Sequence, residues 1–142
     1  MATEDMLAKV ELFAELEPED LKRLARVTVV RDYAAGDVIV REGELGVAFY
    51  IVASGRIEIV KGLGTPSESV VATMGHEDFF GEMALFDNQV RSASVRAAEQ
   101  TQCLVLTKWD FNAELASSSS IALAMLAVLA RRIRGMTEAA TH

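Results

Sequence analysis

Hydrophobic and polar positions follow three patterns in turn along the chain. Polar and acidic residues open two short helical segments, the first capped by Thr3 and the second beginning at Pro18. From about Val27 to Thr107, short β-branched and aromatic runs are interrupted by glycines, which is typical of an all-β barrel or double-sheet roll. Helical signals then return. The pattern predicts helices, then strands, then helices.

Two apolar runs within the β region flank Ser54-Gly55. They occupy residues 47–52 and 57–60, and their spacing predicts a β-hairpin. A looser segment over residues 62–67, which contains Gly62 and Gly64, joins the next strand.

The C-terminal third predicts a short helix over residues 109–115 and a longer one that reaches about Met136. Ser117 to Ser120 offer several N-caps for the longer helix. One apolar row runs at i, i+4 through Ile121, Met125, Leu129 and Ile133. An overlapping seam has three-four-three spacing and consists of Leu126, Leu129, Ile133 and Met136. Leu123 and Val128 lie outside both rows, so a second buried face is expected.

That second face has three candidate partners. They are the β-roll of the same subunit, the same helix in a second subunit, and a ligand that the helix covers. We expect the Leu126, Leu129, Ile133 and Met136 seam to form a homodimer, and the alternative is a helix that simply covers the roll.

Length and charge limit the classes of function. At 142 residues the chain is one domain long, and its net charge of −7 opposes nucleic-acid binding, which needs clustered Lys and Arg. The one basic cluster, residues 131–134, is interpreted as cations that offset the dipole near the end of a helix. Cys103 lies in an apolar run and is expected to be buried and inert. With no signal sequence and no bilayer-length apolar run, we expect a cytoplasmic protein without membrane contact.

The strongest chemical signal is the segment 79–86, followed by Arg91-Ser92-Ala93. Gly81 permits a sharp backbone turn, and the helix formers after it predict a single helical turn whose first N–H groups can hold a phosphate. The guanidinium of Arg91 matches two phosphate oxygens at once. Glu82 would be repelled by a phosphate unless it faced a donor such as a ribose hydroxyl. The combination therefore indicates a sugar phosphate.

Each of these residues also has a purely structural interpretation. Glu82 could be a favourable acid at a helix N-terminus, and Arg91 could pair with Asp87 or Asp32 on the surface. Gly43 and Gly46 are expected to serve turns. Glu42 is expected to be structural.

The pattern Phe-Gly-Glu, apolar, Ala, Leu, then Arg before a small residue resembles the phosphate-binding cassette of the cyclic nucleotide-binding domain family. The resemblance extends over nearly the whole chain, from Tyr33 and Gly36-Asp37 through Tyr50-Ile51-Val52 to Met74-Gly75. It implies a mainly β fold with flanking α-helices: a β-roll or jelly roll (double-stranded β-helix) of about eight strands. One domain, 1–142, would comprise N-terminal helices (1–28), the roll (29–108) with the cassette (79–95), and hinge and lid helices (109–137).

The resemblance also implies a ligand set. The binding residues would be Phe80, Gly81, Glu82, Met83, Ala84, Leu85, Arg91, Ser92 and Ala93. The family usually contacts the purine from the C-terminal helix, where Arg131, Arg134 and Thr137 are the candidates. The hydroxyl of Ser92 can donate to a phosphate oxygen, and we expect cAMP, with cGMP as the alternative. Binding would draw the last helix over the base.

Catalysis is not expected. The chain contains only His76 and His142, too few for a cupin-type metal site, and it shows no Ser-His-Asp or Cys-His arrangement. We expect no cofactor and no metal. The alternative function is a ligand-independent interaction or dimerisation domain of the same fold. The family's DNA-binding regulators continue into a helix-turn-helix, which this sequence does not contain, so its output is expected to lie in an effector protein or in a longer regulator, channel or kinase.

Overall fold

The computed structural model describes residues 2–141, which form two compact units. One unit is helical and joins the residues up to Val27 to those from Phe111 onward. The other is the β-rich segment Thr28–Asp110. The boundary between them falls inside helix α3, Lys108–Ser117.

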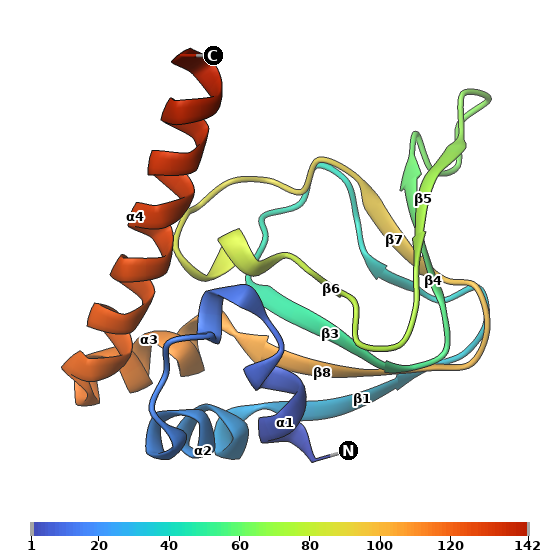
Figure 1. Ribbon diagram of the computed structural model, residues 1–142. Coiled ribbons are helices and arrows are strands. Elements are labelled where there is room, and N and C mark those ends of the chain that lie inside the picture. The colour runs from blue at the N-terminus through green and yellow to red at the C-terminus, as the bar shows by residue number, and fades with distance from the viewer. Residues whose placement is uncertain (1, 142) are drawn as a thin grey trace. The chain divides into compact units, whose positions relative to one another are not determined.

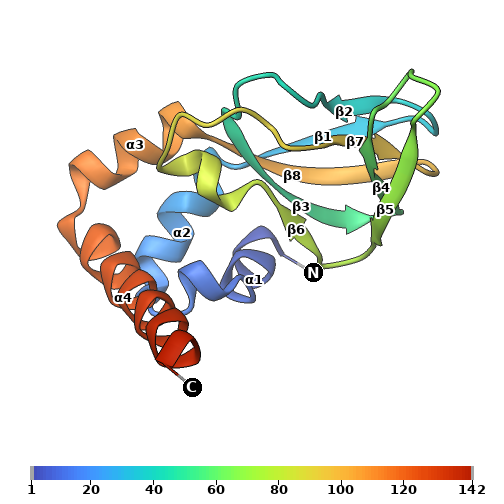
Figure 2. The same ribbon diagram turned by 90° about the horizontal axis from the view of Figure 1, so that it is seen from above.

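The β unit consists of two four-stranded antiparallel sheets (Figures 1 and 2). Its strands are β1 Val29–Tyr33, β2 Val38–Val40, β3 Ala48–Ser54, β4 Ile57–Lys61, β5 Ser69–Met74, β6 Phe79–Phe80, β7 Ser94–Ala97 and β8 Thr101–Thr107. The sheet orders are β1-β8-β3-β6 and β2-β7-β4-β5, so the first strand pairs with the last. This arrangement confirms the predicted mainly β roll of about eight strands.

The core of the β unit joins apolar side chains from both sheets. Val52 of β3 packs in one cluster with Ile57 of β4 and Val95 of β7, all fully or nearly fully buried. Burial of apolar surface of this kind is the main favourable term in folding. Cys103 of β8 is also buried, and burial raises the pKa of its thiol to about 11. The prediction of an inert thiol is consistent with this position.

The predicted hairpin around Ser54-Gly55 is wrong. β3 pairs with β6 and β8, whereas β4 pairs with β5 and β7, so the chain passes from one sheet to the other at this turn. Ser54 lies opposite Gln102 in one sheet, and Ile57 lies opposite Ala97 in the other. The segment 97–102 therefore makes the same crossing beside it. The hydroxyl of Thr101 joins the two crossings, because it donates to the carbonyl of Arg56 at 3.1 Å.

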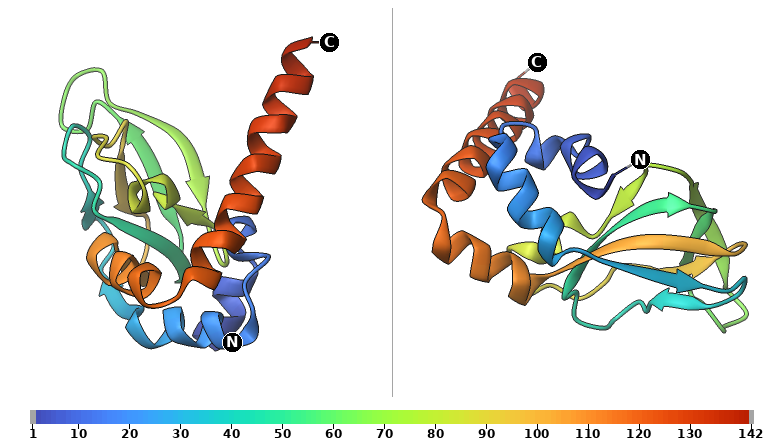
Figure 3. Two further views of the ribbon diagram at one scale, coloured as in Figure 1. Left: turned by 90° about the vertical axis from the view of Figure 1, so that its left-hand side faces the viewer. Right: turned by 90° about the horizontal axis from the view of Figure 1, so that it is seen from below.

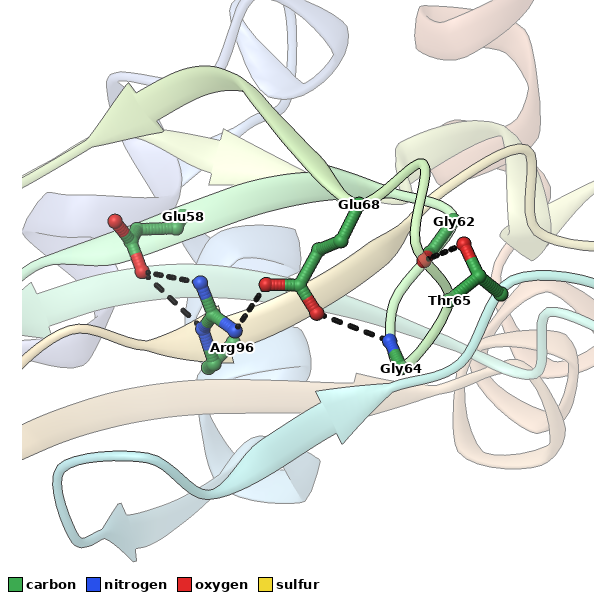
Figure 4. A network of polar contacts seen from close by, with 6 residues as sticks. All are labelled: Glu58, Gly62, Gly64, Thr65, Glu68 and Arg96. Carbon is green, nitrogen blue, oxygen red and sulfur yellow. Dashed lines mark hydrogen bonds and ion pairs between the residues drawn. The ribbon is translucent and has the colours of Figure 1, made fainter.

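A polar network fastens the loop between β4 and β5 (Figure 4). Arg96 of β7 donates to Glu58, which lies opposite it on β4, and to Glu68. The other oxygen of Glu68 accepts the backbone N–H of Gly64 at 2.9 Å, and this bond is the main reason that the pKa of Glu68 is lowered. The loop is thereby bound to β7, the strand at the end of the predicted cassette.

The helical unit contains α1 Thr3–Ala8, a 3-10 turn η1 Glu11–Phe13, α2 Pro18–Val27, most of α3, and α4 Ser119–Thr141. The predicted start of α2 at Pro18 is confirmed. The predicted cap at Thr3 is wrong, because Ala2 occupies the cap position and Thr3 is the first helical residue. The helix over residues 3–8 has no side-chain cap. Burial of Met6 and Leu7 stabilises it instead, because tertiary packing supplies most of the stability of a short helix.

Helix α4 is one continuous helix that extends five residues beyond the predicted end at Met136 (Figure 3). Its buried face is Ile121, Met125 and Val128, at i, i+4 and i+7. The predicted i, i+4 row is therefore buried only in its first half, since Ile133 is 64% exposed. Leu126 and Met136 are also exposed.

The basic cluster 131–134 lies inside α4, so its interpretation as compensation of the helix dipole is wrong. Arg131 pairs with Glu15 at 3.0 Å, and Arg132 pairs with Glu11 at 3.0 Å. These ion pairs connect α4 to η1 and the segment after it. Among the described residues, no single helix is long and apolar enough to cross a bilayer, and α3 and α4 reach that threshold only as a pair bent by 112°.

The crossing at Gly55 generates the first testable prediction. Gly55 has φ +93°, and an added Cβ would lie 2.5 Å from the carbonyl oxygen of Gln100 and 2.7 Å from the Cα of Thr101. Because both a left-handed conformation and a backbone clash oppose a side chain, Gly55→Ala should lower the free energy of unfolding by about 3 kcal/mol. Gly64→Ala is the matched control, since Gly64 has φ +81° and open space around it. Equal urea midpoints for the two variants would contradict the packed crossing.

Candidate functional site

The predicted cassette, residues 79–95, begins with β6. Phe80 pairs with Tyr50 of β3, and the two rings stack with their centroids 4.8 Å apart. Gly81 follows with φ +81° and caps the 3-10 turn η2, Glu82–Leu85. The single helical turn expected after a glycine is thus observed. The N–H groups that open such a turn have no partner inside it, which suits them to an anion.

Arg91 precedes β7 and holds its guanidinium half-buried inside the roll. Nη2 donates to the carbonyl oxygen of Ala48 at 2.7 Å, and the guanidinium carbon lies 5.9 Å from the centroid of the Tyr50 ring. Burial lowers the pKa of Arg91 from its ordinary value, because desolvation disfavours the charged form. The proximity of a cation to the π face of Tyr50 offsets part of this loss.

No carboxylate pairs with Arg91 within residues 2–141. The alternative that it serves as a surface partner of Asp87 or Asp32 is therefore wrong. Asp32 instead accepts a hydrogen bond from Gln102 at 3.2 Å. A charge removed from water needs a counter-charge, so a half-buried guanidinium that lacks a negative partner is suited to an anion.

Two glycines pack against this guanidinium. An added Cβ at Gly46 would lie 3.1 Å from Nε of Arg91 and 3.1 Å from the Cβ of Ala84. A Cβ at Gly81 would collide with Nη1 of Arg91. The prediction that Gly46 serves a turn is wrong, since it makes close contact with Arg91 and lies outside the positive-φ region. Gly43, with φ +87°, does occupy a turn.

Backbone and side-chain bonds fix the chain on either side of Arg91. Its N–H donates to the carbonyl of Glu44 at 2.7 Å, and its carbonyl accepts the N–H of Gly43 at 2.9 Å. Lys61 donates to the carbonyl of Ser92. Glu42 accepts the N–H of Gly62 at 3.1 Å, and its own N–H donates to Ser94. The structural interpretation of Glu42 is confirmed.

A cavity of about 340 Å³ opens in front of the guanidinium. The predicted site residues that line it are Phe80, Gly81, Glu82, Met83, Ala84, Arg91, Ser92 and Ala93. Leu85 does not line it, because its side chain is 1% exposed and belongs to the core. The sequence reasoning missed several lining residues: Val40, Gly46, Ile59, Asp87, Gln89, Val90 and Val95. Ile59 and Val95 lie opposite each other on β4 and β7, so only the strand register brings them here.

The charged residues that line the cavity are Arg91, which is partly desolvated, and the acids Glu82 and Asp87. Glu82 is half-buried and lines the cavity with Arg91. Burial raises the pKa of Tyr50, whose ring stacks on Phe80, and raises that of Tyr33 to about 12, but neither tyrosine lines the cavity. Such a cavity can take a small molecule that carries one anionic group and, elsewhere, hydroxyl donors.

The three candidate base contacts lie in the helical unit. Arg131 is paired with Glu15, and the hydroxyl of Thr137 donates to the carbonyl of Ile133 at 3.0 Å. Arg134 is exposed and borders a shallow hollow with Ile133 and Thr137. Their role toward a base stays a prediction. In the part of the chain that is described, no group of three or more His, Cys, Asp or Glu could hold a metal ion.

Comparison with known proteins assigns this chain to a family. The family description "Cyclic nucleotide-binding domain" matches residues 30–118. A cyclic AMP receptor protein of Thermus thermophilus is 37% identical over 123 residues, which cover 87% of this chain and 57% of the receptor. Human cGMP-dependent protein kinase 2 is 34% identical over 110 residues, which cover 76% of this chain and 14% of the kinase.

A solved structure agrees with these sequence relatives. The N-terminal domain of a transcriptional regulator from Streptomyces coelicolor superposes with a TM-score of 0.87 at 30% identity, over 95% of this chain and 94% of that domain. The match thus covers both the roll and the helices. With its double-sheet roll and its Phe-Gly-Glu turn facing Arg91, the chain belongs to the cyclic nucleotide-binding domain family, whose members are ligand-binding regulatory domains.

Proposed function

We propose that the 340 Å³ cavity binds a cyclic mononucleotide, cAMP rather than cGMP, and that this chain acts as its sensor domain without catalysing a reaction. The observation that carries the proposal is the half-buried guanidinium of Arg91, which has no carboxylate partner within residues 2–141. A phosphodiester carries the single negative charge that this position requires, and its two free oxygens match the guanidinium.

The other lining groups suit the remainder of the ligand. The small side chains of Ala84 and Ala93 leave the backbone of the turn accessible to the phosphate. Glu82 accepts a hydrogen bond from the ribose hydroxyl, which keeps its carboxylate away from the phosphate. Ser92 is exposed at the cavity and donates to a phosphate oxygen. The name of the Thermus thermophilus relative supports cAMP, whereas that of the human kinase keeps cGMP as the alternative.

The output is proposed to be a population shift. Nucleotide favours one arrangement of the hinge over residues 111–120 and of α4, provided that this arrangement binds it more tightly. Dimerisation through α4, contact with an effector protein and a cytoplasmic location belong to the same proposal. The competing function is a ligand-independent interaction domain of this fold. Titration of nucleotide-free protein with cAMP and cGMP by calorimetry separates the two.

Replacement of Arg91 tests the phosphate contact. Arg91→Ala should weaken cAMP binding at least about thirtyfold, or roughly 2 kcal/mol, because the charge-assisted bonds to the phosphate are lost. Arg91→Lys should lose nearly as much, since an ammonium cannot match two oxygens at once. Arg41→Ala is the control in calorimetry, because it removes the same charge from an exposed loop residue that does not line the cavity. Equal losses for Arg41→Ala and Arg91→Ala would reject a specific phosphate contact.

Gly46 tests whether the placement of the guanidinium matters. Gly46→Ala puts a methyl group 3.1 Å from Nε of Arg91 and should displace the guanidinium, so cAMP affinity should fall about tenfold. Gly43→Ala is the comparison, since open space surrounds Gly43 and only its turn is strained. If affinity fell equally in both variants, loop strain rather than Arg91 placement would explain the loss.

The exposed seam of α4 tests the dimer. Leu126, Ile133 and Met136 are 60–69% exposed, and such a stripe favours pairing with a second copy. Light scattering at micromolar protein should give the mass of a dimer, and Leu126→Lys with Ile133→Lys should give a monomer that melts at the same temperature within a few degrees. A monomeric wild-type mass would remove the dimer from the proposal.

A further inference from the structure

Asp20 is a buried carboxylate that plays no part in the proposed ligand site. It lies in the first turn of α2 and is 5% exposed. Its Oδ1 accepts the hydroxyl of Ser118 at 3.2 Å, and its Oδ2 accepts the hydroxyl of Ser120 at 2.5 Å. The two hydroxyls lie 2.9 Å from each other. Both oxygens of one acid are therefore bound by one short stretch of chain.

That stretch is the junction between the last two helices. α3 ends at Ser117 and α4 begins at Ser119, so Ser118 alone separates them, and the helix axes bend by 112° there. Asp20 reaches this junction from almost one hundred residues away in sequence. The local sequence 117–120 supplies hydroxyl donors, but the acceptor comes from α2.

The hydrogen bonds to Asp20 contribute substantially to stability because its carboxylate is buried. Within residues 2–141 no ion pair involves Asp20, and its two oxygens accept the hydroxyls of Ser118 and Ser120, which lie at the N-terminal end of α4. A helix of 23 residues presents a positive dipole end and N–H groups there. A buried carboxylate that loses its donors is strongly disfavoured. A change in the bend angle at Ser118 would separate these partners.

We infer that Asp20, Ser118 and Ser120 form a latch that fixes the start of α4 against α2, and that Asp20 is a positioning residue for the response of α4 to nucleotide. The coupling to nucleotide rests on the proposed function. A bond that exists in one arrangement of the hinge and is broken in the other contributes its free energy to the equilibrium between them. Removal of the latch therefore alters both the angular range of α4 and the affinity for ligand.

Distances between spin labels on α2 and α4 test the latch without ligand. Labels are attached at Arg26→Cys and Ala127→Cys, both exposed sites, while the buried Cys103 stays unlabelled. Wild-type protein should give one narrow distance distribution. Asp20→Asn, which keeps the shape of the side chain, should broaden or shift it. The Ser118→Ala and Ser120→Ala double variant should also broaden or shift the distance distribution. It can replace Asp20→Asn in this experiment if Asp20→Asn fails to fold.

Glu19→Ala is the matched control, because Glu19 is the neighbouring acid of α2, is 85% exposed and pairs only locally with Lys22. Unchanged distances in Asp20→Asn and in the double serine variant would overturn the latch. A distribution broadened equally by Glu19→Ala would also overturn it, since general loosening of α2 would then be the cause.

Calorimetric titration with cAMP tests the coupling. Asp20→Asn should change the dissociation constant at least threefold, toward tighter binding if nucleotide disfavours the latched arrangement and toward weaker binding if nucleotide favours it. Altered distances with unchanged affinity would overturn the coupling. Failure of wild-type protein to bind either nucleotide would overturn the proposed function and the coupling, while the label distances would still decide whether the latch exists.

Discussion

The half-buried guanidinium of Arg91 is the constraint around which the β unit is organised. A cation in this position loses hydration, and the protein offsets the loss with the Ala48 carbonyl and the face of Tyr50 rather than with a carboxylate. Two glycines pack against it: a Cβ at Gly81 would collide with the guanidinium, and one at Gly46 would lie in tight contact with it. The space that the guanidinium occupies thus favours a small residue in the β2–β3 connection and at the end of β6, which are distant in sequence.

The crossings between sheets explain how those segments meet. β3 leaves its sheet at Ser54 and β4 enters the other, while the chain returns through 97–102 beside it. The hydroxyl of Thr101 connects the two crossings, and Gly55 allows them to touch. At the other end of β3, a bridge between Leu45 and Val90 and the bond from the Arg91 N–H to the carbonyl of Glu44 place Arg91 within reach of the carbonyl of Ala48. The site is therefore a product of the roll and not of one loop.

The helical unit follows a different principle, in which charged and polar contacts orient a helix whose apolar face is only partly buried. Ile121, Met125 and Val128 anchor the first half of α4 in the core. Asp20 accepts a hydrogen bond from Ser120 in the first turn of α4. Farther along α4, Arg131 pairs with Glu15 and Arg132 pairs with Glu11. The second half has few buried apolar contacts, which is the usual condition for a segment that moves or binds a partner.

The order of elements, the double-sheet roll and the glycine, acid and arginine of the cassette could be predicted from the amino-acid sequence. These features depend on local periodicity, on the turn at Gly81 and on a spacing that resembles a known family. That β3 and β4 belong to different sheets could be seen only in the folded molecule, since Ser-Gly suits a crossing as well as a hairpin. Only the folded molecule shows that Gly46 faces Arg91, that Leu85 is core, that Val128 is buried, and that Asp20 meets Ser118 and Ser120. The reason is physical: these outcomes depend on contacts between residues far apart in the chain, and local periodicity carries no information about which distant partner a side chain meets.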